Sequence, residues 1–426
     1  GIYDHIGFGF HRYATDRTWK VPHFEKMLYD QALLITAYLD AFRRSGNERY
    51  ARSARETVEF VLREMRASEG AFHSAIDAES EGEEGKYYLW SREEILEVLP
   101  ESGEEVADFF HVNEGGNWTD PVSGETQPSN ILHADPGRDP EEEIAAWEEK
   151  RKALLRRREE RAAPSLDDKI LTDWNALLMR ALALAAAVLE EPAYAERAGE
   201  IRRFIETRMY GEGGELLHSY HGGQASVRGH LDDYAFLAAA YLELYRLDYD
   251  VELLEEAVRI TDQALTLFED GGHGGFYLSD GRESNLPLRS KQLFDAAAPS
   301  GGSVMAENLA LLYRLTGEPR FREQLMKAAA AHAGEIEQVP SAATLLLSSL
   351  SSIAGEGGRE LVIVGDGDEA ARIEEVAHKR SRQSDVVLRK SSANAERLSR
   401  IAAYSAGYRA DERTGASAYL CRAFVC

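Results

Sequence analysis

The first 35 residues carry the densest group of side chains that could do chemistry. Three of the 12 histidines in the chain fall there. Imidazole and carboxyl groups transfer protons near neutral pH, so His11, His23 and Glu25 are candidates for acid–base catalysis. The side chains expected to hold a substrate in this stretch are Asp4, His5, Arg12, Tyr29 and Asp30. The structural alternative is an aromatic, glycine-containing loop that only closes the end of a helical barrel.

Further polar clusters lie at the expected starts of later helices. Asp77 opens an acidic stretch and Asp233 lies in GHLDDYA, so these two carboxyl groups could act as the pair of a glycoside hydrolase. The remaining candidates for substrate binding are Trp174, Asn175, Tyr234, Arg289, Lys291 and Asp295. Helix capping and solvated surface charge are the alternatives for all of them.

No metal site and no cofactor are expected. The acids from Asp77 onward resemble an EF-hand calcium loop up to Gly82, but Tyr88 stands where the twelfth-position glutamate should be. The sequence has no zinc-type spacing of His and Cys, no phosphate loop and no dinucleotide fingerprint.

Helices arranged in pairs must position these clusters. In each pair the first helix is apolar nearly all round and the second has a single apolar stripe, which is typical of an inner helix covered by an outer one. The expected pairs are 24–44 with 48–66, 174–189 with 193–209, 234–247 with 251–268, and 304–315 with 321–336. The repeat predicts a mainly α fold, an α/α toroid of helical hairpins, with an open solenoid as the rival. The charged run 141–161 is expected to be a solvated helix.

The pattern changes after residue 354. Short apolar runs at 360–365 and 386–389 flank a helical segment, and 417–425 could be a last strand. We therefore expect a toroid domain over 1–354 and a small α/β appendage over 355–426.

The charge and the cysteine content of the chain limit the classes of partner and the locations to be expected. The net charge of −25 argues against nucleic acid and anionic membrane as partners, and no uninterrupted apolar run reaches 18 residues. Cysteine occurs only at Cys421 and Cys426, which fits a cytoplasmic location. These two thiols could form a disulfide or stay free and buried.

Several motifs together resemble one family. GIYDHIGFGFHRY, PHFEKMLYDQA, DAESEGEEGKYYLW, DDKILTDWNALL, GHLDDYAFL and PSGGS are similar to the YyaL / spermatogenesis-associated protein 20 family. The resemblance implies a helical part related to six-hairpin glycosidases and to N-acylglucosamine 2-epimerase. It also implies a covalently linked thioredoxin-like domain and a first helical hairpin, both absent from this chain, so that the six-hairpin barrel is incomplete. Gly302 stands where the family usually has Asn.

These observations favour a sugar-acting enzyme with its site at the mouth of the toroid. An epimerase or isomerase would use His11 or His23 to remove a proton and a second His or Glu25 to return it. A hydrolase would use a carboxyl pair such as Asp77 and Asp233. The alternative is a non-catalytic module that binds a ligand or partner and supports the thioredoxin-like redox domain.

Overall fold

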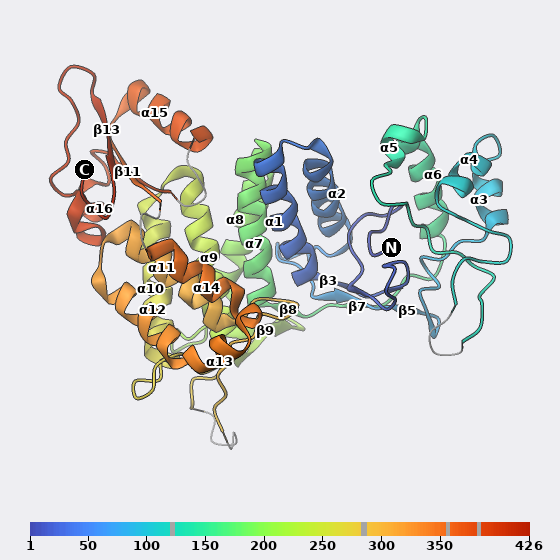
Figure 1. The fold of residues 1–426 in the computed structure, drawn as a ribbon, viewed down its shortest axis with the longest axis horizontal. Coiled ribbons are helices and arrows are strands. Elements are labelled where there is room, and N and C mark those ends of the chain that lie inside the picture. The colour runs from blue at the N-terminus through green and yellow to red at the C-terminus, as the bar shows by residue number, and fades with distance from the viewer. Residues whose placement is uncertain (120–123, 283–287, 355–357, 381–384) are drawn as a thin grey trace. The chain divides into compact units, whose positions relative to one another are not determined.

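The computed structural model describes residues 1–426 except 120–123, 283–287, 355–357 and 381–384, and for 378–380 it describes the backbone alone (Figure 1). The chain divides into two compact units, Gly1–Leu171 and Thr172–Cys426. Each unit is described by itself.

The first unit begins with short strands and one helical hairpin. The strands before the hairpin are β1 (Tyr13–Ala14), β2 (Pro22–His23) and β3 (Lys26–Met27), and the hairpin is α1 (Leu28–Ser45) with α2 (Glu48–Glu64). Gly46 ends α1 in a left-handed conformation (φ 66°) and Asn47 caps α2 through the backbone N–H of Arg49. This confirms the first predicted pair.

The rest of the first unit is a sheet and a lobe of short helices. Its elements are β4 (Ala75–Ile76), β5 (Glu79–Ser80), β6 (Glu83–Glu84), α3 (Arg92–Val98), α4 (Gly103–Phe109), α5 (Pro140–Glu143), α6 (Trp147–Glu159), β7 (Leu166–Asp167) and β8 (Ile170–Leu171). Strand β4 pairs antiparallel with both β3 and β7, which ties the start of α1 to the end of the unit. The prediction that 141–161 is fully solvated is wrong in part, because Arg151 and Arg158 of α6 are buried.

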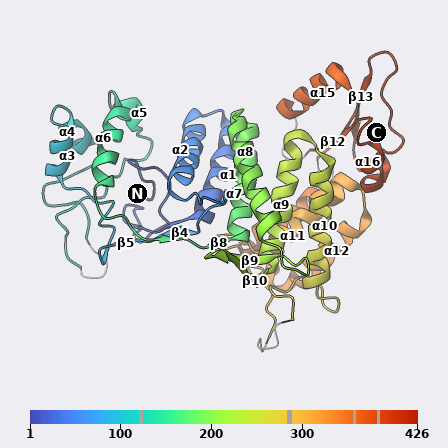
Figure 2. The same ribbon diagram turned by 180° about the vertical axis from the view of Figure 1, so that it is seen from behind.

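The second unit repeats helical hairpins. Its elements up to residue 353 are α7 (Thr172–Leu189), α8 (Pro192–Arg208), β9 (Leu217–His221), β10 (Gln224–Arg228), α9 (Leu231–Asp248), α10 (Val251–Phe268), α11 (Gly301–Thr316), α12 (Pro319–Ala331), α13 (Ala333–Gln338), η1 (Pro340–Ala343) and α14 (Thr344–Ile353). Helix α9 packs between α7 and α11, while α8, α10 and α12 each pack on the helix that precedes them (Figure 2). Fourteen residues of α7 are buried but only four of α8, so the predicted distinction between inner and outer helices is confirmed.

Among the described helices, α7 alone is long and apolar enough to cross a membrane by length and composition. In the structure 78% of it is buried, as expected of a core helix.

The second unit ends in the small α/β segment that the sequence predicts. Its elements are β11 (Glu360–Gly365), α15 (Gly367–Arg380), β12 (Val386–Lys390), α16 (Ala395–Ile401), η2 (Ala403–Ser405) and β13 (Ala416–Cys421). Strand β11 is central, parallel to β12 and antiparallel to β13. The Tyr245 hydroxyl of α9 donates to the Val387 carbonyl (3.0 Å), so the segment packs against the hairpins. The fold class, mainly α with repeated α/α hairpins and a C-terminal α/β appendage, is confirmed; the domain boundary near residue 355 stays a prediction.

Candidate functional site

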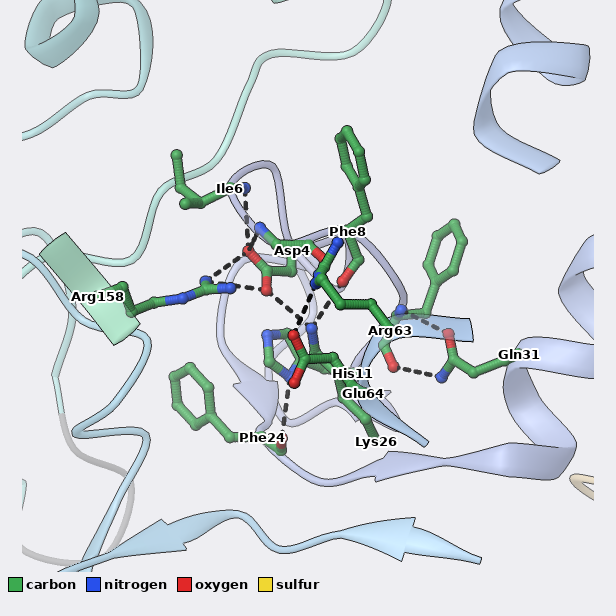
Figure 3. Close-up of polar contacts among 12 residues, drawn as sticks. Asp4, Ile6, Phe8, His11, Phe24, Lys26, Gln31, Arg63, Glu64 and Arg158 are labelled. Carbon is green, nitrogen blue, oxygen red and sulfur yellow. Dashed lines mark hydrogen bonds and ion pairs between the residues drawn. The ribbon is translucent and has the colours of Figure 1, made fainter. Parts of the chain in front are cut away.

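The opening stretch folds around a buried ion-pair cluster (Figure 3). The Asp4 carboxylate accepts from Lys26 Nζ (2.8 Å) and from Arg158 Nη1 (2.9 Å), and it also accepts from the N–H groups of Ile6 and Gly7 (3.0 Å each). Lys26 Nζ donates further to the Phe8 carbonyl (2.7 Å). Burial alone would raise the pKa of Asp4, but Arg158 and Lys26 hold that pKa well below its usual range. The charged groups of Asp4, Lys26 and Arg158 pair with one another, so the role of the cluster is to hold the loop.

Two of the predicted histidines pack within this same loop, and His11 is buried. His11 Nδ1 lies 2.9 Å from the Phe24 carbonyl, and its ring packs edge-on against Phe24 and Tyr88. Burial lowers the pKa of both His11 and His5 to about 3. Both imidazoles are therefore neutral at pH 7, and His11 has the contacts of a packing residue.

The other predicted residues of the opening stretch form a half-exposed network. Glu25 Oε2 accepts from Arg12 Nη1 (2.9 Å) and lies 3.0 Å from His23 Nε2, and Arg12 Nε donates to the Tyr29 hydroxyl (3.1 Å). Burial raises the pKa of Asp30 to about 7, although Arg12 opposes this rise. Asp30 therefore has the pKa of a proton-transfer group, and the functional role of these five residues stays a prediction.

Asp77 lies apart from this network, in an exposed loop. Its Oδ2 accepts from the Ser165 hydroxyl (3.1 Å) and its Oδ1 from the Glu79 N–H (3.2 Å). Asp77 belongs to the first unit and Asp233 to the second, so their action as a carboxyl pair stays a prediction.

The second unit gathers a different set of titratable groups at the starts of its inner helices. Asp233 of α9 is fully buried, and both of its oxygens lie near His218 Nδ1 (3.0 and 3.1 Å). The same carboxylate accepts from the backbone N–H of Asp173 (3.0 Å) and of His230 (2.7 Å). We call Asp173, His218, His230, Asp232 and Asp233 the acid–base cluster.

Local sequence rules explain why these side chains meet. His230 is the N-cap of α9 and Asp233 is its third residue, so the Asp233 carboxylate closes a capping box. The Thr172 hydroxyl at the start of α7 donates to the Leu217 carbonyl (2.6 Å). The Tyr234 hydroxyl accepts from the Leu216 N–H (3.0 Å). These two bonds fix the beginning of β9, and His218 follows directly.

Several pKa values in the cluster are raised, so that Asp173 and His218 stay protonated at pH 7. Burial, and then the nearby Asp233 charge, raise the pKa of Asp173 to about 8. Burial disfavours the charged form of His218, but the hydrogen bond to Asp233 and the nearby acidic charges together outweigh it and raise the pKa of His218 to about 9. Burial likewise raises the pKa of Asp232 to about 6. The side chains of His218 and His230 are 23% and 35% exposed, so the buried acids connect to solvent through imidazoles.

Three residues of the acid–base cluster also carry the donor atoms of a cation site. Potential ligand atoms of His218, His230 and Asp233 lie within 4.8 Å of one another. However, His218 and two backbone N–H groups already use the Asp233 carboxylate. These hydrogen bonds describe a proton-linked pair, which is how we interpret the cluster.

The remaining predicted residues of the second unit have mainly structural contacts. Tyr234 is buried against Phe268, and Asn175 is buried on the first turn of α7, next to the half-buried Trp174. Lys291 Nζ donates to Asp270 (2.8 Å) and the Gly274 carbonyl (2.6 Å).

Two more predicted residues hold loops of the second unit. Arg289 donates to the Ser279 carbonyl (3.0 Å) and its guanidinium lies 4.0 Å from the Tyr277 ring centre. Asp295 accepts from the N–H groups of Ser300 (3.1 Å) and Leu345 (3.0 Å). These contacts hold the Arg289 and Asp295 side chains in place ahead of α11.

Sequence reasoning missed His218 and the raised pKa of Asp173, and neither residue was among its candidates. The available signal was the gathering of acids at the expected starts of inner helices, with His218 and His230 close to Asp233 in sequence.

Comparison with known proteins gives relatives by sequence and by fold. Spermatogenesis-associated protein 20 of Homo sapiens is 35% identical over 408 residues, which cover 86% of this chain and 51% of that protein. An uncharacterized protein of Caenorhabditis elegans, B0495.5, is 30% identical over 465 residues, covering 100% of this chain and 62% of its own length. No family model matches the chain.

Solved structures also match the chain, at low sequence identity and with TM-scores below 0.5. Cellobiose 2-epimerase from Bacillus thermoamylovorans is 12% identical, with 84% of each chain covered and a TM-score of 0.45. A family 76 mannosidase from Bacteroides thetaiotaomicron is 13% identical, with 78% of this chain and 66% of that chain covered and a TM-score of 0.43. Likeness at these scores does not identify an activity.

The chain spans about half the length of the mammalian relatives that it matches. Over that half, the sequence identity confirms what the motifs indicated: this chain is a relative of spermatogenesis-associated protein 20.

Proposed function

We propose that this chain is an acid–base enzyme that acts on a hydroxyl-rich small molecule, a sugar or sugar derivative, at the acid–base cluster. The observation that carries the proposal is the buried Asp233 carboxylate, bonded at once to His218 and to the backbone of Asp173.

The protonation states of Asp173 and His218 support acid–base chemistry. At pH 7 the raised pKa values, about 8 for Asp173 and about 9 for His218, leave both groups protonated. A general acid works best when its pKa lies near the working pH, because it then holds a proton and still gives it up readily. Groups whose environments push their pKa values away from the usual ones mark the acid and base roles of a site.

Each residue then has a distinct part. His218 is the partly exposed proton donor and acceptor that meets the substrate, and Asp233 orients its imidazole and stabilises the imidazolium form. Asp173 is a second, buried proton store. The half-buried indole of Trp174 follows Asp173 on the first turn of α7, and an aromatic face of this kind packs against the apolar side of a sugar ring.

Two reaction classes remain compatible with these parts. Epimerisation or isomerisation needs removal and return of a carbon-bound proton, whereas glycoside cleavage needs a proton on the leaving oxygen. His23, Glu25 and Asp30 are proposed separately, as acid–base residues within the first unit. An upstream thioredoxin-like domain and a cytoplasmic setting belong to the same proposal.

A sugar panel in deuterated water separates these classes. Proton NMR reports epimerisation or isomerisation as loss of a carbon-bound proton signal, and new reducing ends report hydrolysis. We expect His218→Asn to lower turnover by about 10²- to 10⁴-fold, the usual contribution of a positioned acid or base. His221→Asn changes an exposed histidine on the same strand and should leave turnover within about twofold.

Two results would count against the proposal. Turnover that His218→Asn leaves unchanged would remove the acid–base cluster from the chemistry. A sugar that binds and protects the cluster without any turnover would favour the non-catalytic binding module instead.

A further inference from the structure

The two cysteines form a disulfide with unequal exposure. Cys421 ends β13 and is buried, while Cys426 is exposed. A thiolate that attacks the disulfide can therefore reach the sulfur of Cys426 more readily, and the sulfur of Cys421 is the one that leaves. Accessibility of the attacked sulfur is one of the factors that sets the rate of exchange.

A tyrosine hydroxyl lies against both sulfurs. The Tyr408 hydroxyl is 2.9 Å from Cys426 Sγ and 3.5 Å from Cys421 Sγ. Disulfide sulfurs carry no hydrogen, so the hydroxyl must be the donor in both contacts. The Tyr408 ring stacks on Tyr419 of β13 (4.4 Å between centres), which keeps the hydroxyl in place. When Cys421 leaves as a thiolate, this donor is already at hydrogen-bonding distance.

The disulfide closes a turn whose backbone is unfavourable. Arg422 and Val425 exchange N–H to carbonyl bonds of 2.9 and 3.0 Å across two central residues. Both central residues, Ala423 and Phe424, have positive φ (48° and 66°) although neither is glycine. Such turns favour Gly, Asn or Asp at these positions, so the covalent link holds a conformation that the free chain disfavours.

The turn is also attached to the helical hairpins of its own unit. The Phe424 ring packs edge-on against Tyr313 of α11 (5.4 Å) and lies 5.0 Å from the Tyr404 ring. The Phe424 N–H donates to Glu360 (3.3 Å), which in turn faces Arg314 of α11 (3.7 Å). Opening the disulfide would release this aromatic contact with an inner helix.

We propose that Cys421–Cys426 is a thiol–disulfide exchange site whose substrate class is a dithiol protein or small dithiol. One thiolate of the dithiol attacks Cys426 Sγ, a mixed disulfide forms, and the bond to Cys421 breaks to leave the Cys421 thiolate beside the Tyr408 hydroxyl. The second thiolate of the dithiol then attacks the first sulfur of the same dithiol, which is bonded to Cys426 Sγ in the mixed disulfide. This attack releases Cys426 as a thiolate. Two electrons pass to this chain, the dithiol becomes a disulfide, and the two new thiolates take up two protons from water.

A trapping experiment on the full chain tests the order of attack. The probe is a thioredoxin in which the second cysteine of the active pair is replaced by serine, so that the mixed disulfide cannot resolve. Peptide mass spectrometry should find the adduct on Cys426. An adduct on Cys421, or two maleimide-reactive thiols in the protein isolated without reductant, would overturn the proposal.

A matched pair of tyrosine variants tests the hydroxyl. With dithiothreitol as the probe, Tyr408→Phe should slow reduction by about three- to tenfold, the effect of one lost hydrogen bond. Tyr404→Phe removes a hydroxyl next to the same aromatic group without touching sulfur, and it should stay within about twofold. Equal rates for the two variants, with unchanged circular dichroism, would remove Tyr408 from the exchange and overturn this part of the proposal.

Discussion

Asp4 and Asp233 are both buried carboxylates, one in each unit, and they differ in what surrounds them. Asp4 meets two cationic side chains and two backbone N–H groups. Asp233 meets a single ionisable donor within 3.5 Å, His218, and lies among other acids whose pKa values are raised. A carboxylate with matched cations is fixed in charge and serves structure, whereas one that shares protons with its neighbours can exchange them.

The comparison also shows that a stretch of sequence rich in reactive side chains need not be the place where such side chains can react in the folded protein. The opening stretch has more histidine per residue than the second unit, yet its most buried charged members pair with one another. In the second unit, groups that lie 3, 15 and 60 residues from Asp233 along the chain, those of His230, His218 and Asp173, meet around its carboxylate.

The largest effect should come from removing the fixed charge. Asp4→Ala leaves Lys26 and Arg158 buried without their partner, and breaking a buried pair in this way costs about 3–5 kcal/mol. Urea unfolding of the chain measures the loss. The exposed Asp77→Ala is the control and should stay within about 0.5 kcal/mol. Equal losses for both variants would end the structural interpretation of the Asp4 cluster.

Alkaline pH should act on the two units with opposite signs. In the second unit the pKa values of about 8 for Asp173 and about 9 for His218 exceed the ordinary 3.8 and 6.5. The folded unit therefore binds more protons than the unfolded one, and its stability falls as pH rises from 7 to 9. In the first unit burial lowers the pKa of Lys26 from 10.5 to about 8, so that this group makes stability rise above pH 8.

Hydrogen exchange resolved by helix measures this difference. After correction for intrinsic rates, protection of α7 and α9 should fall between pH 8 and 9, above the pKa of about 7 of Asp30, while that of α1 and α2 does not. Asp173→Asn keeps an uncharged group at this position and should flatten the fall between pH 7 and 8. Exposed Asp248→Asn is the control for the same unit. A parallel fall in both units would contradict the assignment of protons to the cluster.

A smaller effect is expected where α11 begins. A Cβ added at Gly301 would lie 2.1 Å from Asp232 Oδ1 and 3.1 Å from its Cα, whereas at Gly302 the nearest atom is the Gln292 carbonyl oxygen at 3.1 Å. Gly301→Ala should destabilise by about 1–3 kcal/mol, as overpacking does, and should disturb turnover. Gly302→Ala should be close to neutral, because alanine favours a helix and offsets the tighter contact. Thermal unfolding of the two variants distinguishes them, and equal shifts would remove Asp232 from the explanation.

The smallest effect belongs to the half-exposed network of the first unit. Arg12 and Glu25 have side chains 40% and 28% exposed, so Arg12→Ala should cost about 0–1 kcal/mol of stability. Removing the cation should raise the pKa of Asp30 further, since Arg12 lowers it. Titration of the Asp30 carboxyl by carbon-13 NMR measures the shift. A loss of stability above about 2 kcal/mol would show that this network is structural, like the Asp4 cluster.

Much of the fold could be predicted because helices record their surroundings locally. The all-round apolar run of α7 and the single stripe of α2 differ because one is covered on several sides and the other on one. Gly46 and Asn47 marked a hairpin turn for the same local reason. The charge run of α6 misled, since residue type does not reveal that Arg158 turns inward to meet Asp4.

The candidate site was only partly predictable. Asp233, Trp174 and Asn175 lie at helix starts, where sequence places caps and first-turn residues. The pairing of Asp233 with His218 depends on the Thr172–Leu217 and Tyr234–Leu216 bonds, which join segments 45 and 18 residues apart. No local pattern reports such long-range bonds.

By itself the sequence determined the helical hairpins and the change from hairpins to alternating strands and helices in the C-terminal segment. It also determined which residues are able to do chemistry. Each of these depends on residue types and on neighbours along the chain. The tertiary structure alone decided which of them hold a proton. That property depends on burial and on the number of opposing charges within a few ångströms, and folding brings those charges from distant parts of the chain.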